Sequence, residues 1–356
     1  MPGLQLEGAG EVTDLSVGDL GTGKRERQAL ARRRETLSQG AILIIAIVAV
    51  IPVAYLVRSN LVLSLMTQAV IAGVLATSVG FLIRQSGAVT FGNAAFYGTA
   101  AYCVALPLKA GLSLPLGIAL ALVIPPALAY LLGLVIVRIP GIAFSMLTLA
   151  IGQALSELAL KARWLTGGED GFSFALPKTV VGLDASFLQR PTSMLIFSWS
   201  VLVLVLFGLS LFSRSRYGRV VAAIRENEER ARFIGYQTVS RRAATFALSA
   251  FVASIGGVLA TLYNSFVSPE TMHWSLSGMA LIMAIIGGTQ LLWGAVVGAA
   301  FVFFAKDWAG DIGEHWQAVI GVILIVVTVG LPGGISGAMM QIASRGSRLF
   351  KGRGAP

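Results

Sequence analysis

Long apolar runs, separated by short clusters of charged residues, follow one another along most of the chain. Several of them exceed the roughly 18 apolar residues that a membrane-spanning helix needs. The pattern therefore predicts an all-α polytopic membrane protein with about ten spans, some of them short or broken. The expected spans are 40–57, 61–83, 92–108, 112–136, 141–160, 193–212, 243–263, 276–289, 291–306 and 316–331.

The segments 276–289 and 291–306 are each too short to cross a membrane perpendicularly. They form either two steeply broken helices or one re-entrant pair, and both alternatives leave the number of spans even. The distribution of basic residues agrees with an even number. With both termini in the cytoplasm, 20 of the 27 Lys and Arg residues lie on that side and 7 outside. Because cytoplasmic loops carry the excess of positive charge, we expect an N-in/C-in topology.

Composition excludes several other classes of protein. Hydrophobic residues make up 56% of the 356-residue chain and charged residues only 12%, about half the charged share of a soluble domain. The single cysteine, Cys103, excludes an internal disulfide, and two histidines are too few for a Cys/His metal cluster. The net charge of +10 comes from basic loops beside apolar segments. We therefore expect neither a metal site nor a nucleic-acid partner.

The chain divides into three predicted regions. Residues 1–39 have no sustained periodicity and read as a disordered, basic cytoplasmic tail. Residues 40–335 form the transmembrane domain, and 336–356 form a basic cytoplasmic C-terminal tail. The only long internal loop is 213–242. The phosphate-binding motif GxxxxGK[ST] does not occur, so the chain is not expected to hydrolyse nucleotide itself.

The loop 213–242 contains a predicted helix over 219–234, because that stretch has helix-forming composition and no Gly or Pro. Gly235 is expected to end this helix. One face is apolar, and opposite charges lie four residues apart on the rest of its surface. The apolar face is Val220, Ile224, Ala231 and Ile234, and the charge pairs are Glu226–Arg230 and Glu228–Arg232.

Two interpretations fit a charged, amphipathic helix between two spans. It lies on anionic lipid, or it is a rigid lever that seats in a cytoplasmic partner. Three closely spaced acids, Glu226, Glu228 and Glu229, are unfavourable beside an anionic lipid surface. The sequence therefore favours the lever.

Two features inside the spans have alternative explanations. The segment 80–102 interrupts an apolar run with polar residues and glycines, which either allows close helix packing or unwinds backbone beside a cavity. Glu157, the one acid predicted inside a span, lies on one helix face with Gln153 and Lys161. It is either a functional carboxylate or half of a structural ion pair with Lys161.

Five separated motifs occur in a fixed order. They are 86–98 (SGAVTFGNAAFYG), 141–150 (GIAFSMLTLA), 164–171 (WLTGGEDG), 218–228 (GRVVAAIRENE) with Ala231 and Gly235, and 266–278 (FVSPETMHWSLSG). In this order they resemble the signatures of the branched-chain amino acid ABC transporter permeases, and more narrowly those of the longer, LivM-type subunit. The resemblance covers about residues 40–335.

This resemblance implies a permease subunit, not an enzyme, in a bacterial inner-membrane importer of branched-chain or related amino acids. Its implied partners are a second permease subunit, two cytoplasmic ATPases and a periplasmic or lipid-anchored solute-binding protein. ATP and Mg²⁺ are expected on the ATPases, and no cofactor on this chain. Because relatives import urea and short amides, a urea or amide importer is one alternative. A stand-alone secondary carrier is another, from a different class.

The resemblance also assigns expected roles to individual residues. The loop 213–242 becomes the coupling loop, and its candidate ATPase-coupling residues are Arg219, Ile224, Arg225, Glu226, Asn227, Glu228, Ala231 and Gly235. From the residues themselves, the broken segment 86–98, with glycines and the polar Thr90 and Asn93 at the break, is expected beside the translocation path, next to one face of the span 141–160. The candidate path residues are Ser86, Thr90, Asn93, Ser145, Thr148 and Gly152. The alternative for this segment is close packing against another span.

Overall fold

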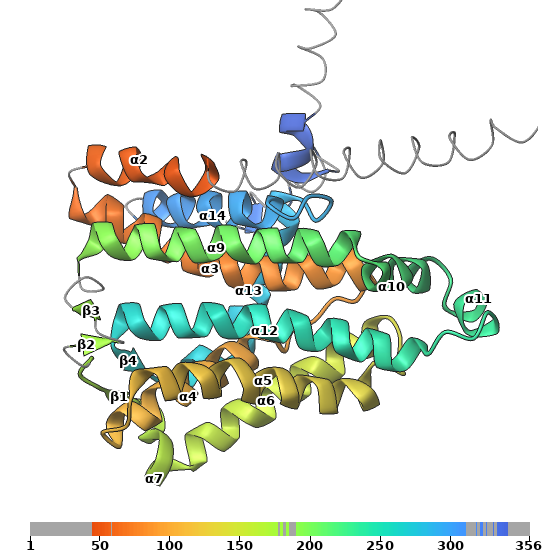
Figure 1. Cartoon of the computed structure of the whole chain (residues 1–356), viewed down its shortest axis with the longest axis horizontal. Helices are drawn as coiled ribbons and strands as arrows, with labels where there is room; N and C mark the ends of the chain where they lie inside the picture. The colour runs from red at the N-terminus through yellow and green to blue at the C-terminus, as the bar shows by residue number, and fades with distance from the viewer. Residues whose placement is uncertain are drawn as a thin grey trace, which may run out of the picture. The chain divides into compact units, whose positions relative to one another are not determined.

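The structure is a computed structural model that describes residues 45–57, 59–176, 179–180, 183–184, 190–310, 318, 321–322, 325, 330 and 333–340. Contacts divide the chain into a unit of residues 1–49 and a second unit that begins at Val50. All elements named below belong to the second unit (Figure 1). The predicted tail 1–39 lies outside the described residues, and of 336–356 only 336–340 are described, as helix.

The described elements are almost all helical. The longer helices are α2 (Val50–Leu56), α3 (Asn60–Ser86), α4 (Asn93–Lys109), α5 (Leu114–Ile136), α6 (Ile142–Lys161), α9 (Pro191–Arg214), α10 (Arg216–Glu226), α12 (Thr238–Asn264), α13 (Trp274–Gly287) and α14 (Gly294–Gly310). The short ones are α7 (Arg163–Thr166), η1 (Gly168–Asp170), α11 (Glu228–Phe233) and η2 (Pro269–Met272). Two antiparallel pairs of two-residue strands complete the fold: β1 (Phe172–Ser173) with β4 (Phe266–Val267), and β2 (Thr179–Val180) with β3 (Leu183–Asp184).

Five of the described helices are long and apolar enough to cross a membrane: α3, α5, α6, α9 and α12. They correspond to five of the predicted spans, and the all-α class is confirmed. The predicted span 92–108 is α4, which has 17 residues. The number ten is not tested, because parts of 40–57 and most of 316–331 lie outside the described residues.

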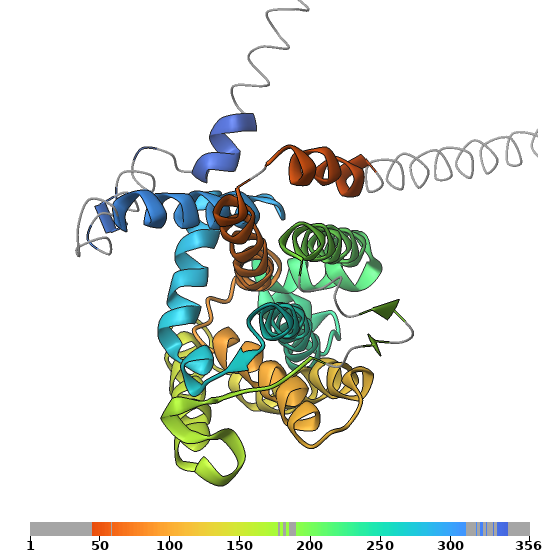
Figure 2. The same cartoon turned by 90° about the vertical axis from the view of Figure 1, so that its left-hand side faces the viewer.

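The helices α3 and α12 form the centre of the bundle. In the most apolar 18-residue stretch of each helix, 67% of the residues are buried. They pack on one another and on α4, α5 and α9, and Figure 2 shows α3, α9 and α12 end on. Close approach requires small residues: a methyl group at Gly257 would overlap the carbonyl oxygen of Tyr97 on α4. Such contacts matter in a membrane, where helices gain little from apolar burial alone.

A second close contact joins α13 to α14. A Cβ at Gly287 would overlap the carbonyl of Gly294, and a Cβ at Gly298 would overlap that of Met283. The helix α13 lies across the long helices in both views (Figures 1 and 2). With 14 residues it is only about 21 Å long. It is therefore not a perpendicular span, and 276–306 contains two short helices packed on one another.

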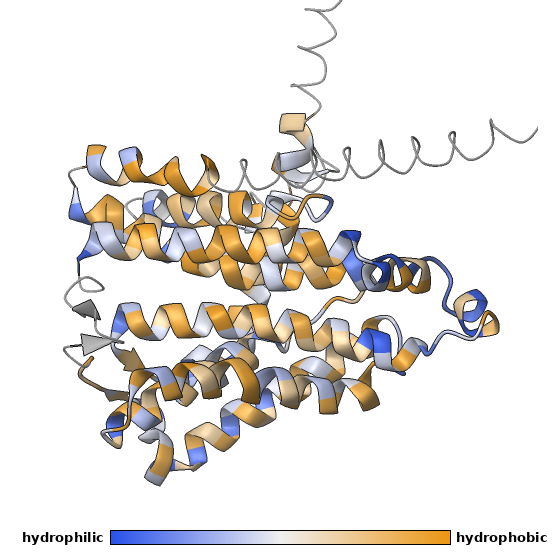
Figure 3. Ribbon diagram, in the orientation of Figure 1, coloured by the Kyte–Doolittle hydropathy of each residue, from blue (hydrophilic) through white to orange (hydrophobic). Residues whose placement is uncertain are grey.

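Hydrophilic residues gather at one end of the bundle. Figure 3 shows them in α10, α11 and the start of α12, whereas the long helices are mainly apolar. This end corresponds to the predicted loop 213–242. It is called the α10–α11 end below.

Candidate functional site

The predicted single helix 219–234 is wrong, because the chain breaks at Asn227. This residue is extended, with φ −156° and ψ 101°. Its side-chain oxygen accepts a hydrogen bond from the backbone N–H of Arg230 at 2.8 Å. Asn is among the best residues for capping a helix in this way. The segment is therefore two helices, α10 and α11, joined by a cap.

The break changes which residues face the bundle. Val221, Ile224 and Ala231 are buried, so two of the four predicted apolar-face residues were identified correctly. Val220 is only half-buried, and Ile234 is 71% exposed. The predicted apolar face would form only on one continuous helix. Because the chain breaks at Asn227, α11 does not continue the face of α10.

Two side chains attach α10 to the end of α3. The Gln85 amide donates to the carbonyl oxygen of Gly218, and the Arg225 guanidinium donates to that of Arg84. Gly218 lies so close to the end of α9 that a methyl group there would overlap the carbonyl of Phe212. The α10 helix is therefore fixed to the two longer helices α3 and α9.

Ion pairs attach α11 to α12. Glu228 pairs with Arg242 at 2.7 Å and with Arg232 at 3.6 Å, so the predicted Glu228–Arg232 pair is present. The predicted Glu226–Arg230 pair is not formed, although both residues are described. Glu228 thus connects the lever to the bundle, whereas Glu226 remains exposed.

An aromatic contact adds a third attachment. The Arg241 guanidinium lies 5.1 Å from the ring centre of Tyr217 and 5.3 Å from that of Tyr236, a favourable cation–π arrangement. Burial raises the pKa of the Tyr217 phenol, and the positive charge of Arg241 partly opposes this shift.

Of the two most exposed apolar residues of this end, the sequence analysis missed Phe233 and assigned Ile234 to the apolar face. Phe233 is 90% exposed and Ile234 is 71% exposed. Gly235 follows with φ +92° and closes α11, as expected. Two adjacent large apolar residues inside a charged loop are the sequence signal that could have identified this tip. Among the eight candidate coupling residues, Arg219, Arg225, Glu226, Asn227 and Gly235 are exposed, Glu228 is half-buried, and Ile224 and Ala231 are buried.

The predicted break between spans is also present. Gly87, with φ +70°, ends α3, and the chain runs without helix over 87–92 before α4 begins at Asn93. Thr90 is buried, and its hydroxyl accepts from the N–H of Gly92 at 3.1 Å. The first turn of α4 therefore starts inside the bundle.

A buried polar cluster holds this helix start. The Asn93 amide donates to the Ser78 hydroxyl at 2.7 Å and to the Ser249 hydroxyl at 2.9 Å. The N–H of Ala94 donates to the Ser277 hydroxyl at 2.7 Å. All four side chains of this Asn93 cluster (Ser78, Asn93, Ser249 and Ser277) are fully buried. The side-chain amide oxygen of Asn93, Oδ1, has no hydrogen-bond partner. The cluster connects α3, α4, α12 and α13.

The expected neighbour of the broken segment is confirmed. The Ser145 hydroxyl donates to the carbonyl of Val89 at 2.8 Å, and the Thr148 hydroxyl accepts from the N–H of Phe91 at 3.2 Å. A Cβ on Gly152 would lie 3.6 Å from Gly92 Cα. Only about 10 Å³ of cavity lies between these elements. In this conformation the inner face of α6 therefore packs tightly on 87–92.

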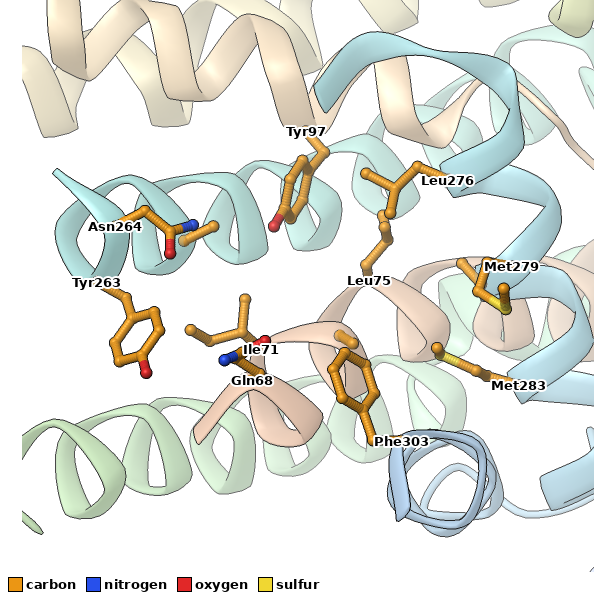
Figure 4. Close-up of a pocket in the computed structure, with 13 residues that line it drawn as sticks. Gln68, Ile71, Leu75, Tyr97, Tyr263, Asn264, Leu276, Met279, Met283 and Phe303 are labelled. Atoms are coloured by element: carbon orange, nitrogen blue, oxygen red, sulfur yellow. The ribbon is translucent and has the colours of Figure 1, made fainter. Parts of the chain in front are cut away.

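A larger cavity of about 150 Å³ lies between α3, α12, α13 and α14 (Figure 4). Apolar side chains form most of its wall, and Gln68, Tyr97, Tyr263 and Asn264 supply polar groups. Ser64 links two of these, because its hydroxyl lies 2.6 Å from Tyr263 and accepts from Gln68 at 3.2 Å. The cavity is smaller than the roughly 300–1,000 Å³ of most ligand pockets. The sequence analysis did not predict it.

At the end opposite α10–α11, β1 and β4 bring two of the sequence motifs together. Phe172, which directly follows the motif 164–171, pairs with Val267 of the motif 266–278. Gly171 has φ +58°, and a methyl group there would overlap the carbonyl of Val267.

Among the described residues, no three His, Cys, Asp or Glu side chains form a group that could hold a metal ion.

Removing the Asn93 amide should weaken the bundle. Asn93→Ala is expected to lower the free energy of unfolding by about 1–3 kcal/mol, because it deletes two buried hydrogen bonds. The measurement is the thermal midpoint of the purified protein in detergent. Asn264→Ala, at an exposed position at the end of α12, is the matched control and should leave the midpoint unchanged. Equal midpoints for both variants would contradict a stabilising role of the cluster.

Comparison with known proteins identifies relatives over most of the chain. A profile of the family described as "branched-chain amino acid transport system / permease component" matches residues 61–328. The chain is 26% identical to the high-affinity branched-chain amino acid transport system permease protein LivM of Salmonella typhimurium over 290 residues, 76% of this chain and 68% of the relative. For LivM of Escherichia coli the identity is 25% over 283 residues, 74% and 67% of the two chains.

A shorter stretch of the chain matches the high-affinity branched-chain amino acid transport system permease protein LivH of Escherichia coli. The identity is 30% over 162 residues, which cover 44% of this chain and 52% of LivH. No solved structure matches the chain. The profile spans α3 to α14, which includes the broken segment, α6 and the α10–α11 end. The chain is therefore a multi-pass membrane protein and belongs to the family of branched-chain amino acid transport system permease components, with LivM-type relatives.

Proposed function

We propose that this chain is the permease subunit of an ABC importer in the bacterial inner membrane, and that its solutes are branched-chain or related amino acids. The observation that carries this proposal is the family match over 61–328, which includes the α10–α11 end. A stand-alone secondary carrier is disfavoured, because the family is a component of a larger transport system. Urea or short amides are the alternative solutes.

The partners follow from the same proposal. A second permease subunit pairs with this one in the bilayer, two cytoplasmic ATPases bind ATP and Mg²⁺, and a solute-binding protein delivers the solute from outside. In this scheme the chain is a transport subunit and not an enzyme. The coupling lever is α10–α11, and the surface that meets an ATPase includes the exposed Phe233 and Ile234 as well as the predicted Arg219 and Glu226.

The attachments of the lever support this role. ATP hydrolysis moves solute only if movement of the ATPase reaches the spans, and a loose loop would absorb that movement. Here Arg225 holds the end of α3, and Glu228 holds α12 through Arg242. Both α3 and α12 form the centre of the bundle. A displacement of the lever would therefore reach the helices on which the others pack.

The double variant Phe233→Ala/Ile234→Ala should uncouple the transporter. Removing two exposed apolar side chains is expected to reduce ATP-driven leucine uptake into membrane vesicles at least tenfold and to weaken co-purification of the ATPases, as truncation of interface anchors does. The thermal midpoint of the permease should not change, because neither side chain is buried. Leu112→Ala, at the exposed α4–α5 connection, is the matched control. Unchanged uptake in the double variant would overturn the assignment of the tip.

We further propose about ten spans, in an even number, with both termini in the cytoplasm, as the 20-to-7 partition of basic residues indicates. Tags at Met1 and Pro356 should both resist a protease added from outside and become accessible after permeabilisation. A tag at Pro356 that is cleaved in intact cells would show that one span is miscounted.

The broken segment 86–98 and the inner face of α6 are proposed to act beside the solute path. Helix ends offer partial charges to an amino acid zwitterion without a buried ion, and α4 begins inside the bundle at Asn93. The candidate residues remain Ser86, Thr90, Asn93, Ser145, Thr148 and Gly152. Because these elements pack tightly here, access to them requires that α6 moves away from 87–92 during transport.

A thiol at Thr148 should therefore respond to the transport state. In a Cys103→Ser background, Thr148→Cys is expected to react slowly with a small polar thiol reagent at rest, since Thr148 is buried. The rate should rise at least tenfold during ATP turnover with solute and binding protein. An Asn93→Cys variant gives a second position. Constant low rates in variants that still transport would show that the segment only packs.

A further inference from the structure

The outward faces of α5 and α6 differ in chemistry. On α5, large apolar side chains are exposed along the helix: Leu116, Val123, Ile124, Leu131 and Val135. This helix contains no charged residue. Such a surface is suited to contact with lipid hydrocarbon, which is as apolar as the side chains themselves.

The helix α6 presents a different stripe on the side away from the bundle. The exposed residues of this α6 stripe are Ala143, Met146, Ala150, Ala154 and Glu157, and the apolar Ile142 and Leu158 on its two sides are exposed as well. At 3.6 residues per turn they fall opposite the buried residues Phe144, Thr148, Gly152 and Ala159. In the most apolar 18-residue stretch of α6 only 28% of the residues are buried, whereas 67% are buried in the corresponding stretches of α3 and α12. In both views α6 lies at the edge of the bundle (Figures 1 and 2).

The α6 stripe carries a carboxylate that no described residue of the chain neutralises. Glu157 is exposed and accepts one hydrogen bond, from the Gln153 amide at 3.2 Å. The expected pair with Lys161 is not formed, and among the described residues no cation lies within ion-pair distance of Glu157. The other atom of the amide, Gln153 Oε1, is shielded from solvent and has no partner.

A carboxylate and an unsatisfied amide on a lipid-facing surface would be costly. An acid at the centre of a spanning helix costs roughly 2.5–3.5 kcal/mol unless it faces protein or water, and the cost is smaller toward the helix end, where Glu157 lies one turn from Lys161. Since the described residues supply neither a counter-charge nor a second hydrogen-bond donor, an aqueous or polar surface opposite the stripe is favoured. Small side chains at 143, 150 and 154 leave room for that surface close to the helix.

We propose that the α6 stripe is a wall of the water-filled solute path and that Glu157 binds the ammonium group of the passing amino acid there. The inference rests on the proposed function and deepens it, because the second permease subunit would form the opposite wall. In the conformation described, the inner face of α6 is packed on 87–92, so it is the outer face that contacts the solute before α6 moves. A free carboxylate paired with a neutral amide suits a solute that carries one positive group and an uncharged side chain.

The test uses thiols in the complete transporter, in a Cys103→Ser background. Ala150→Cys lies about 16 Å along α6 from the Lys161 end, and Val123→Cys lies about 13 Å along α5 from the Leu114 end, so the two probe comparable depths. A small polar methanethiosulfonate should modify position 150 at least tenfold faster than position 123. Leucine delivered by the binding protein should slow this reaction. Met146→Cys, also on the stripe and 68% exposed, provides a second probe.

The charge of Glu157 has a separate readout. At Ala154→Cys, one turn from Glu157, a cationic methanethiosulfonate should react about tenfold faster than an anionic one. Adding Glu157→Gln, which keeps the shape of the side chain, should abolish this preference and reduce leucine uptake. A cationic preference that survives Glu157→Gln would overturn the ammonium site.

Three other outcomes of these experiments would each contradict a different part of the proposal. If positions 146 and 150 are as inert as 123 while the variants still take up leucine, the stripe faces lipid or packed protein and this inference fails alone. If all three positions react equally, the contrast between α5 and α6 fails. If the unmodified transporter shows no ATP-driven uptake of any amino acid, the proposed function itself fails.

Discussion

The burial of a helix start inside the bundle is the constraint on which the rest of this structure depends. Where α3 ends and α4 begins, six residues leave the helical hydrogen-bond pattern within a membrane protein. Backbone groups freed in such surroundings must find partners, because lipid offers none. Hydroxyl groups from α6 and α13 supply several of them, through Ser145, Thr148 and Ser277. The positions of α6 and α13 follow from this requirement.

The same requirement explains the buried hydroxyl residues around the broken segment. A hydroxyl group can accept one hydrogen bond and donate another, so a single side chain can serve two partners. Ser249 illustrates this: it accepts from Asn93 and donates to the carbonyl of Ser78. A leucine would fit the apolar surroundings better but would leave both partners without a hydrogen bond. The bundle therefore keeps polar side chains at its most deeply buried crossing.

Sequence reasoning located the spans well, because hydropathy reports directly on burial in lipid. It also placed the α6 face beside the broken segment, which the hydrogen bonds of Ser145 and Thr148 confirm. It was wrong about the lever, where it extended one helix across Asn227. Helix propensity alone gave no reason to stop there, and the cap is recognised only when the N–H of Arg230 is seen to need a partner. The cavity of Figure 4 was not foreseen, because it depends on the crossing of α13 over the long helices.

The attachment of α10 to α3 has a genetic consequence. Both hydrogen bonds of this joint run from a side chain to a main-chain carbonyl, from Gln85 to Gly218 and from Arg225 to Arg84. A carbonyl oxygen is present whatever side chain its residue carries. Substitutions at Arg84 thus leave the acceptor in place, whereas a single change at Gln85 or Arg225 removes a bond outright. The joint is therefore vulnerable at its donors Gln85 and Arg225 and at the closely packed Gly218, and a lost donor can be restored only by a side chain that brings an N–H or O–H group to the same oxygen.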